Sequence, residues 1–298
     1  MVRSRIAPTP SGYLHIGNAV NFAITWLWVR KNKGSLRLRI DDLDTPRSKP
    51  EYVEDIFRTL DWLGLDWDEG PQSPDEQERQ YSQLLRTEVY NEFIKRLVQN
   101  GKVFACTCPR SEIQLHSHDG QYPGTCRYKE LALDKPEKAL RLLTPENTVL
   151  TINDIQKGEV QLDLYKVMRD FVIRRRDGIP AYQIASLKDD LDFNINYIVR
   201  GEDLLYSTAA QLYMANLCNE SGFSRTTFHH HGLLHDDKGN KLSKSAGSVS
   251  LKAWREQGRK PEEFYLALSK MLGWKQAATS LTEMLQLAKL DSALFLNT

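Results

Sequence analysis

The stretch RIAPTPSGYLHIGN, residues 5–18, decides the fold of this 298-residue chain. It starts as a short strand, and two prolines and Gly12 then impose a turn, because proline lacks a backbone N–H and fixes φ. Apolar residues recur at helical spacing after the turn: Ala19, Val20, Phe22, Ala23, Trp26 and Leu27. The stretch therefore predicts a strand-to-helix junction at His15.

A strand-to-helix junction favours an anion, because the first N–H groups of the helix are unpaired and the positive end of its dipole lies there. His15 and Asn18 stand where they can hydrogen-bond a phosphate, and Gly17 lets the backbone approach it. A second stretch, KLSKS at residues 241–245, adds Lys241 and Lys244, whose ammonium groups can neutralise phosphate charge. Together the two stretches predict ATP chemistry.

These stretches resemble the two signature motifs of class I aminoacyl-tRNA synthetases, and the lead-in R-x-A-P-x-P-x-G resembles the glutamyl branch. Further similarity lies in three runs: IDDLDTPR at 40–47, DFVIRRRDG at 170–178 and IVRGEDL at 198–204. The region after Ser245 is too short for the helical anticodon-binding region of a full glutamyl-tRNA synthetase. We therefore expect the chain to resemble most the glutamyl-queuosine tRNA(Asp) synthetases, which are shortened paralogues.

The resemblance implies an α/β fold: a doubly wound parallel-sheet, Rossmann-like nucleotide-binding domain with a small inserted domain and a helical C-terminal region. The apolar pattern agrees, because strand-like and helical runs alternate on both sides of a segment that breaks this rhythm. Four parts are expected: the first half of the catalytic domain at 1–100, an inserted zinc-binding or acceptor subdomain at 101–168, the second half at 169–245 and helices at 246–298. One long helix is expected from about residue 73 to 101.

The resemblance also implies a reaction. The carboxylate of glutamate attacks the α-phosphate of ATP, Mg²⁺ accompanies the nucleotide, and the adenylate passes glutamate to the queuosine base of tRNA(Asp). No protein nucleophile is needed, so positioning and charge neutralisation should carry the catalysis. The implied ATP-binding and catalytic residues are His15, Gly17, Asn18, Lys241 and Lys244. Asn18 replaces the second histidine of the usual signature, but its amide can still donate to phosphate.

The implied glutamate site uses fixed charge, since guanidinium groups hold carboxylates in bidentate geometry. By resemblance Arg5 and Arg200 are those groups, Tyr182 adds a hydroxyl, and Thr9 with Asp41 holds the α-ammonium group. Asp41 stands where the family commonly has glutamate. The aspartate side chain is shorter, so its carboxylate lies about 1 Å further back. A displacement of this size can lower a catalytic rate.

Three of the four cysteines are spaced like metal ligands: Cys106, Cys108 and Cys126. A structural Zn²⁺ takes four ligands, and the resemblance implies Tyr122 as the fourth. His116 or His118 would be chemically better zinc ligands. Reduced, unliganded cysteines in a small insertion are the alternative.

Composition sets further bounds. The chain carries 40 Lys and Arg against 39 Asp and Glu, a formal charge of +1, so the total charge gives no sign of an RNA partner. No run approaches the roughly 18 to 20 apolar residues of a membrane span, and no export signal opens the chain. We expect a cytoplasmic monomer with no membrane association, whose partners are glutamate, ATP and tRNA(Asp) bearing queuosine.

Two other hypotheses stay open. The same activation chemistry could serve another acceptor, such as a small molecule, a carrier or a peptide. Alternatively, the chain could be a catalytically inactive, synthetase-like RNA-binding module, although retention of His15, Lys241 and Lys244 argues against that.

Three further features are expected to be mainly structural. Cys218 lies in an apolar helical stretch and should belong to the core. Trp62 and Trp67 flank a helix end and should be packing residues. Three histidines occupy residues 229–231. Neighbouring residues of a strand point to opposite faces, so the three cannot all face one site, and we expect one of them near the ATP site.

Overall fold

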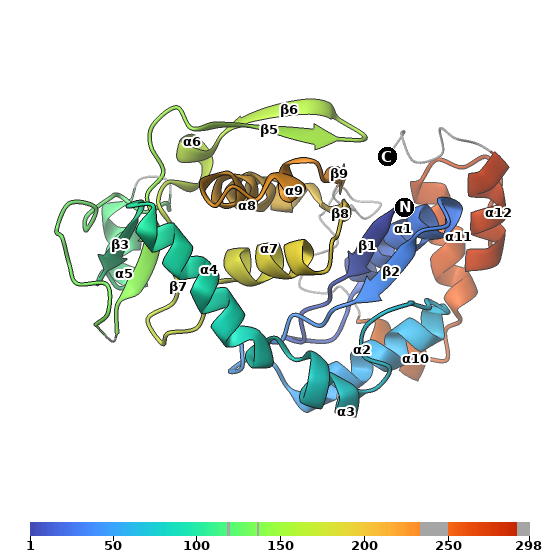
Figure 1. The fold of residues 1–298 in the computed structure, drawn as a ribbon. Coiled ribbons are helices and arrows are strands. Elements are labelled where there is room, and N and C mark those ends of the chain that lie inside the picture. The colour runs from blue at the N-terminus through green and yellow to red at the C-terminus, as the bar shows by residue number, and fades with distance from the viewer. Residues whose placement is uncertain (118–119, 136, 233–249, 291–298) are drawn as a thin grey trace.

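The computed structural model describes residues 1–117, 120–135, 137–232 and 250–290. Parallel strands form the centre of the fold (Figure 1). β1 (Arg3–Ile6) pairs with β2 (Ser35–Leu38), and β8 (Tyr197–Gly201) pairs with β9 (Thr227–His231), both in parallel. The backbone N–H of Asn196 donates to the carbonyl of Arg3 at 3.0 Å. The two pairs therefore lie side by side, as expected for an α/β fold.

Helix α1 (Ile16–Lys31) follows β1 across the predicted turn, and His15 is its N-cap. The helix is apolar on almost every side and lies in the core. α2 (Pro50–Leu63) has one apolar face, starts at a proline and ends at Gly64, whose φ of 71° is left-handed. The strand, turn and helix predicted around His15 are confirmed.

Helices near the end of the described chain complete the same core. They are α10 (Leu251–Glu256), α11 (Pro261–Met271) and α12 (Leu281–Leu290). Phe264, Leu268 and Met284 are fully buried in the cluster that contains α1, and α12 lies beside α1 (Figure 1). The helical C-terminal region is thus confirmed for the described residues. Trp62 and Trp67 pack against this cluster, as expected.

A second core cluster gathers helices from the middle of the chain: α4 (Thr87–Gln99), α6 (Leu164–Met168), α7 (Tyr182–Asp192), α8 (Leu205–Leu217) and α9 (Ser221–Ser224). Cys218 is buried in this cluster, which confirms its assignment to the core. Within the described ranges, no helix combines the length and apolar character that a membrane crossing requires.

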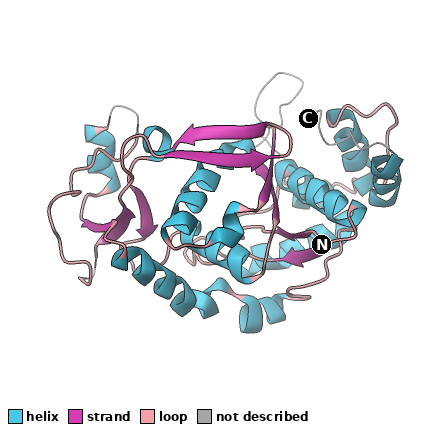
Figure 2. Ribbon diagram, turned by 45° about the horizontal axis from the view of Figure 1, so that its top comes forward, coloured by secondary structure: helices cyan, strands magenta, loops and turns pink. Residues whose placement is uncertain are grey.

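The segment 101–168 supplies strands to two sheets. β3 (Val103–Cys106), β4 (Ala139–Leu142) and β7 (Phe171–Arg174) form a small antiparallel sheet, with α5 (Arg110–His116) beside it in Figure 1. β5 (Val149–Asp154) and β6 (Gly158–Asp163) instead form a hairpin, and β5 pairs in parallel with β9. Figure 2 shows the hairpin apart from the small sheet. Asp154, the last residue of β5, is thereby placed next to β9.

The single helix expected from about residue 73 to 101 is wrong. The chain forms α3 (Pro74–Glu76), a π-helical turn η1 (Gln77–Tyr81), an extended Ser82, a 3-10 turn η2 (Gln83–Arg86) and then α4. Asp42 supplies the physical reason, because it accepts the side-chain amide of Gln77 at 2.9 Å and the backbone N–H of Gln83 at 2.8 Å. A continuous helix would bind that N–H to the carbonyl four residues earlier. The buried carboxylate therefore interrupts the helix.

Candidate active site

A cavity of about 600 Å³ opens at the carboxyl ends of β1 and β8, beside the N-terminus of α1 and the 3-10 turn η3 (Glu202–Leu204). In parallel α/β sheets, ligands bind at this edge. The expected site residues that line the cavity are Arg5, Thr9, His15, Gly17, Asn18, Asp41, Tyr182 and Arg200. The structure thus brings these residues together. Lys241 and Lys244 lie outside the described residues.

His15 caps α1 and is held in one orientation. Its Nδ1 accepts the backbone N–H of Gly17 at 3.1 Å, and its own backbone N–H donates to Oδ1 of Asn18 at 3.0 Å. Burial lowers the pKa of His15, so the ring is neutral at physiological pH. Because Nδ1 is an acceptor, the proton of the neutral ring lies on Nε2. Nε2 of His15 and Nδ2 of Asn18 are therefore the side-chain donors at this helix end.

Gly17 is required by this cap. A Cβ at this position would lie 3.0 Å from both Cε1 and Nδ1 of the His15 ring, tighter than an ordinary contact. A side chain at Gly17 would displace the ring and lengthen the hydrogen bond to its Nδ1.

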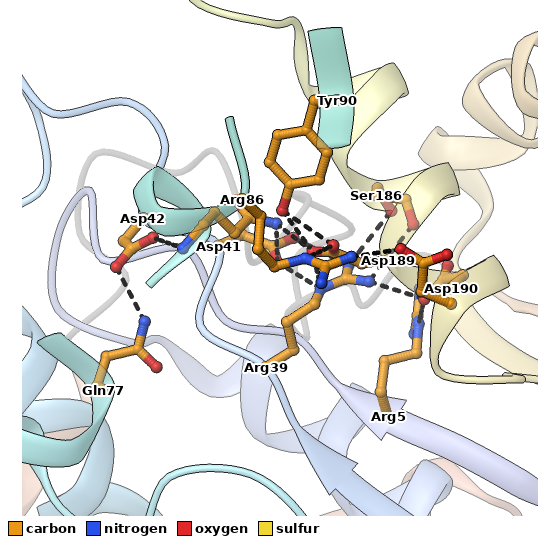
Figure 3. Close-up of polar contacts among 12 residues, drawn as sticks. Arg5, Arg39, Asp41, Asp42, Gln77, Arg86, Tyr90, Ser186, Asp189 and Asp190 are labelled. Carbon is orange, nitrogen blue, oxygen red and sulfur yellow. Dashed lines mark hydrogen bonds and ion pairs between the residues drawn. The ribbon is translucent and has the colours of Figure 1, made fainter. Parts of the chain in front are cut away.

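Asp190, on α7, holds a cluster of arginines beside the cavity (Figure 3). Its Oδ1 accepts Nε of Arg5 at 2.9 Å and Nη1 of Arg39 at 2.8 Å. Its Oδ2 lies 3.8 Å from Nη2 of Arg200. Burial would raise the pKa of Asp190, but the three guanidinium groups lower it. One ionised carboxylate therefore faces three positive charges.

Further side chains extend this network. Arg39 forms a bidentate pair with Asp41, with Nε–Oδ1 at 2.6 Å and Nη2–Oδ2 at 3.2 Å. Asp189 accepts Nε of Arg86 at 2.7 Å. Gln83 joins the two acids, because its Nε2 donates to Asp41 at 3.2 Å and to Asp189 at 2.9 Å. Figure 3 shows how Arg39, Asp41, Arg86 and Asp189 lie in this network. The arginine network includes buried charges, which are costly to leave unpaired.

Arg200 is buried, and one edge of its guanidinium makes no hydrogen bond in the described structure. Its Nη1 donates to Oγ1 of Thr208 at 3.0 Å and to Oε1 of Gln211 at 2.9 Å. Nε and Nη2 have no hydrogen-bond partner in the described structure, and together they form an edge with which a guanidinium binds a carboxylate. Burial lowers the pKa of Arg200, but a guanidinium remains charged in proteins. An anion in the cavity would supply the missing partner.

The three histidines of β9 are all buried and differ in their surroundings. His231 lines the cavity, and its Nε2 lies 3.2 Å from Nδ2 of Asn21. His230 places Nδ1 2.7 Å from Oδ2 of Asp154. Burial lowers the pKa of His229 to about 4. Of the three, only His231 lines this cavity in the described structure, which agrees with the expectation that a single histidine of the run reaches it.

The three cysteines expected to bind metal converge beside β3. Their sulfur atoms lie within 4.8 Å of one another: Cys106, Cys108 and Cys126. Tetrahedral ligands about 2.3 Å from a zinc ion would be about 3.8 Å apart, so the cluster is compatible with zinc. The Tyr122 hydroxyl lies 3.5 Å from Sγ of Cys106 and accepts the backbone N–H of Cys126 at 2.7 Å. Among the described residues His116 is not part of this group, and His118 lies outside them.

The family described as tRNA synthetases class I (E and Q), catalytic domain, matches residues 1–295. The chain belongs to this family. This class I catalytic domain is 37% identical over 279 residues to the glutamate–tRNA ligase of Anaeromyxobacter sp. (strain Fw109-5), and 35% identical over 286 residues to that of Aquifex aeolicus (strain VF5). The alignments cover 91% and 92% of this chain but 58% and 57% of those proteins. The chain therefore spans less than two thirds of the length of these relatives.

Solved structures agree with the family. A glutamate tRNA ligase from Elizabethkingia meningosepticum, solved in complex with its amino acid, has a TM-score of 0.77 and 26% identity, and the match covers 96% of this chain and 64% of that one. Methionyl-tRNA synthetase from Mycobacterium tuberculosis, solved with methionyl-adenylate, has a TM-score of 0.53 and 12% identity, covering 90% and 63%. The second likeness concerns the fold alone. The expected class I, Rossmann-like α/β fold is confirmed.

Asp41, which the resemblance implies to stand in place of a glutamate, lines the cavity. Its Oδ1 accepts hydrogen bonds from both Arg39 and Gln83, whereas Oδ2 accepts only from Arg39 within the described residues. A carboxylate oxygen can accept two hydrogen bonds. Oδ2 therefore keeps acceptor capacity toward the cavity that Asp41 lines.

Sequence reasoning missed Arg39, Asp189 and Asp190, which organise this catalytic domain around its cavity. Isolated charged residues usually face solvent, so none of the three was singled out. Two signals were present: Asp189 and Asp190 are adjacent acids, and Arg39 stands between the apolar residues Leu38 and Ile40. A buried acidic pair and a buried basic residue in the same domain indicate a network.

Replacing Asp190 by alanine should lower the free energy of unfolding by about 3–5 kcal/mol, because it leaves buried guanidinium groups without their acceptor. Urea unfolding followed by circular dichroism measures the change. The control is Glu54→Ala, which removes an exposed partner of Arg58 and should cost about 0.5 kcal/mol or less. Equal losses for the two variants would contradict the role given to Asp190.

Proposed function

We propose that the protein activates glutamate with ATP and transfers the glutamyl group to the queuosine base of tRNA(Asp). One observation carries the proposal: a single cavity is lined both by the donor end of α1 and by Arg200, whose Nε and Nη2 are unpaired. The helix end suits a phosphate and the guanidinium suits a carboxylate. Glutamyl-adenylate carries both groups.

The α1 side of the cavity is assigned to the nucleotide. Nε2 of His15 and Nδ2 of Asn18 would donate to phosphate oxygens, and Gly17 would let the backbone approach them. The neutral ring of His15 acts here as a hydrogen-bond donor. Mg²⁺ would accompany the phosphates.

Lys241 and Lys244 are proposed to act on the same phosphates. Described residues on either side of the stretch 233–249 support this. His231 lines the cavity, and the backbone N–H of Leu251 donates to the carbonyl of Leu14 at 2.8 Å. The chain thus leaves and re-enters the described structure close to the turn that carries the first motif.

The arginine side of the cavity is assigned to glutamate. Its side-chain carboxylate would bind Nε and Nη2 of Arg200 together with the terminal nitrogens of Arg5, whose Nε is already paired. Tyr182 is 41% exposed and would add its hydroxyl. Thr9 and Oδ2 of Asp41 would hold the α-ammonium group. A neutral side-chain amide would bind these guanidinium groups less strongly than a carboxylate, so the site should prefer glutamate to glutamine.

The chemistry needs no protein nucleophile. In the first step an oxygen of the glutamate α-carboxylate bonds to the α-phosphorus of ATP, while the bond to the leaving pyrophosphate breaks. In the second step a hydroxyl of queuosine attacks the acyl carbon and AMP leaves. The chain's own side chains position the two substrates and neutralise the charge that grows on pyrophosphate.

The resemblance to the queuosine-acting branch implies a tyrosine zinc ligand at the position of Tyr122, and the cysteine cluster is compatible with zinc. We propose that Cys106, Cys108, Cys126 and Tyr122 hold Zn²⁺. The hydrogen bond from the backbone N–H of Cys126 would stabilise a phenolate ligand. The metal would stabilise the part of the proposed acceptor-binding subdomain, 101–168, that lies beside the β3–β4–β7 sheet. We propose that this subdomain lies between catalytic halves at 1–100 and 169–245, that helices follow at 246–298, and that the protein acts as a monomer.

Labelled glutamate should pass to tRNA(Asp) only when the tRNA carries queuosine. The measurement is acid-precipitable label after incubation with ATP, and the control is the same tRNA from cells that cannot make queuosine. Equal labelling of both tRNAs would reject the proposed acceptor. Exchange of pyrophosphate into ATP that depends on glutamate, without transfer to either tRNA, would favour another acceptor. No exchange with any amino acid would favour the inactive RNA-binding module.

Purified protein should contain about one zinc ion per chain. Cys126→Ser should lose most of it, because only three of the four proposed ligands remain, and its melting temperature should fall. Elemental analysis of the parent protein and Cys126→Ser, dialysed together, gives the zinc content of each. Cys218→Ser is the matched control, since Cys218 is buried in a different cluster, and it should keep its zinc. Parent protein without zinc, or full zinc in Cys126→Ser, would refute the assignment.

A further inference from the structure

The guanidinium of Arg200 is held at one corner. Both hydrogen atoms of Nη1 are used, one by Oγ1 of Thr208 at 3.0 Å and one by Oε1 of Gln211 at 2.9 Å. Both acceptors lie on α8. A planar guanidinium fixed at Nη1 has a fixed direction for its opposite nitrogens. The partners of Nη1 therefore set where the unpaired Nε and Nη2 point.

The hydroxyl of Thr208 can serve Arg200 only as an acceptor, and its single proton must go elsewhere. Within the described residues two acceptors are in reach: Nε2 of His230 at 2.8 Å and the carbonyl of Leu204 at 3.3 Å. The hydroxyl donates its proton to Nε2 of His230, the closer acceptor, if that nitrogen carries no proton of its own.

Asp154 fixes the tautomer of His230. Its Oδ2 accepts both the backbone N–H and Nδ1 of His230, at 2.8 and 2.7 Å, and its Oδ1 accepts the backbone N–H groups of Gln156 and Lys157 at 2.9 and 2.8 Å. Burial would raise the pKa of Asp154, but these hydrogen bonds lower it to about 2. Burial lowers the pKa of His230 despite this acid. The ring is therefore neutral, with its proton on Nδ1 and a free lone pair on Nε2.

We propose that Asp154, His230 and Thr208 form a positioning relay that aims the unpaired edge of Arg200 at the side-chain carboxylate of the substrate. Every hydrogen bond in the relay runs the same way, from the guanidinium through the hydroxyl and the imidazole to the carboxylate, which strengthens each bond. The inference rests on the proposed function and deepens it, because the relay determines how well the site selects a dicarboxylic amino acid.

The relay acts from outside the cavity. Of its members and Arg200, only Arg200 lines the cavity within the described structure. Asp154 belongs to the β5–β6 hairpin and reaches His230 because β5 pairs with β9. Asp190, the nearest acid to Nη2 of Arg200 that the structure describes, is 3.8 Å away and is already hydrogen-bonded to Arg5 and Arg39. The carboxylate of Asp154 is therefore a second negative charge for Arg200, which it reaches through His230 and Thr208.

Thr208→Val tests the relay, because valine keeps the shape and removes the hydroxyl. In glutamate-dependent exchange of pyrophosphate into ATP, this variant should raise the KM for glutamate at least about tenfold, since Arg200 loses a charged hydrogen bond. The KM for ATP should change by less than about twofold, because the nucleotide side is untouched. Thr208→Ser restores the hydroxyl and should return the KM for glutamate to within about threefold of the parent.

The matched control is Thr25→Val. Thr25 is also buried in a helix, and its hydroxyl donates to the carbonyl of Asn21, four residues earlier, at 2.7 Å. Among the described residues no hydrogen bond joins Thr25 to a member of the relay, so both KM values should stay near those of the parent. A normal KM for glutamate in Thr208→Val, or an equal rise in both KM values, would overturn the proposal.

Crystal structures keep the test independent of the proposed function. In Thr208→Val the Arg200 guanidinium should turn away from its parent position, and in Thr208→Ser it should return. An unmoved guanidinium in Thr208→Val would refute the relay even in a protein that performs exchange. Parent protein without any exchange would instead refute the proposed function, and the guanidinium position would still decide the relay.

Discussion

The contact between the carboxylate of Asp190 and three arginines is the interaction on which the site depends. Arg5, Arg39 and Arg200 carry three positive charges, while Asp190 and Asp41 carry two negative ones, and Asp189 is paired with Arg86. Burying an unpaired charge costs several kcal/mol, so these arginines can pack below a cavity only where the acids meet them. Nε and Nη2 of Arg200 make no hydrogen bond in the described structure, and a substrate carboxylate would supply that partner.

Formation of the site and formation of the fold use the same contacts. Arg5 and Asp190 are 185 residues apart in sequence, and Arg39 and Asp190 are 151 apart. These pairs form only when β1, α7 and the segment after β2 come together, so the arginine side of the cavity exists only in the folded structure. The relay through His230 extends this dependence to the β5–β6 hairpin, since Asp154 reaches the parallel strands through the pairing of β5 with β9.

Local signals explain what the sequence predicted well. The turn before His15 and the helix after it depend on nearby prolines, glycine and apolar spacing, and the described residues that the resemblance implied for the site line one cavity. Contacts between residues far apart in sequence explain what the sequence did not predict. Apolar periodicity continues through Ser82, but Asp42 requires the backbone N–H of Gln83 and breaks the helix. Strand patterns likewise do not reveal that β5 leaves the small sheet for β9, or that Arg39 meets Asp190.

The proposed function requires Arg5 and Arg200 to converge on one substrate carboxylate in the cavity that His15 also lines. A crystal structure of the protein with a non-hydrolysable analogue of glutamyl-adenylate tests it most directly. The account predicts that the glutamyl side-chain carboxylate lies about 2.7–2.9 Å from Nε and Nη2 of Arg200, with the adenylate linkage beside His15. An analogue bound with that carboxylate against other groups, or in a different cavity, would contradict it.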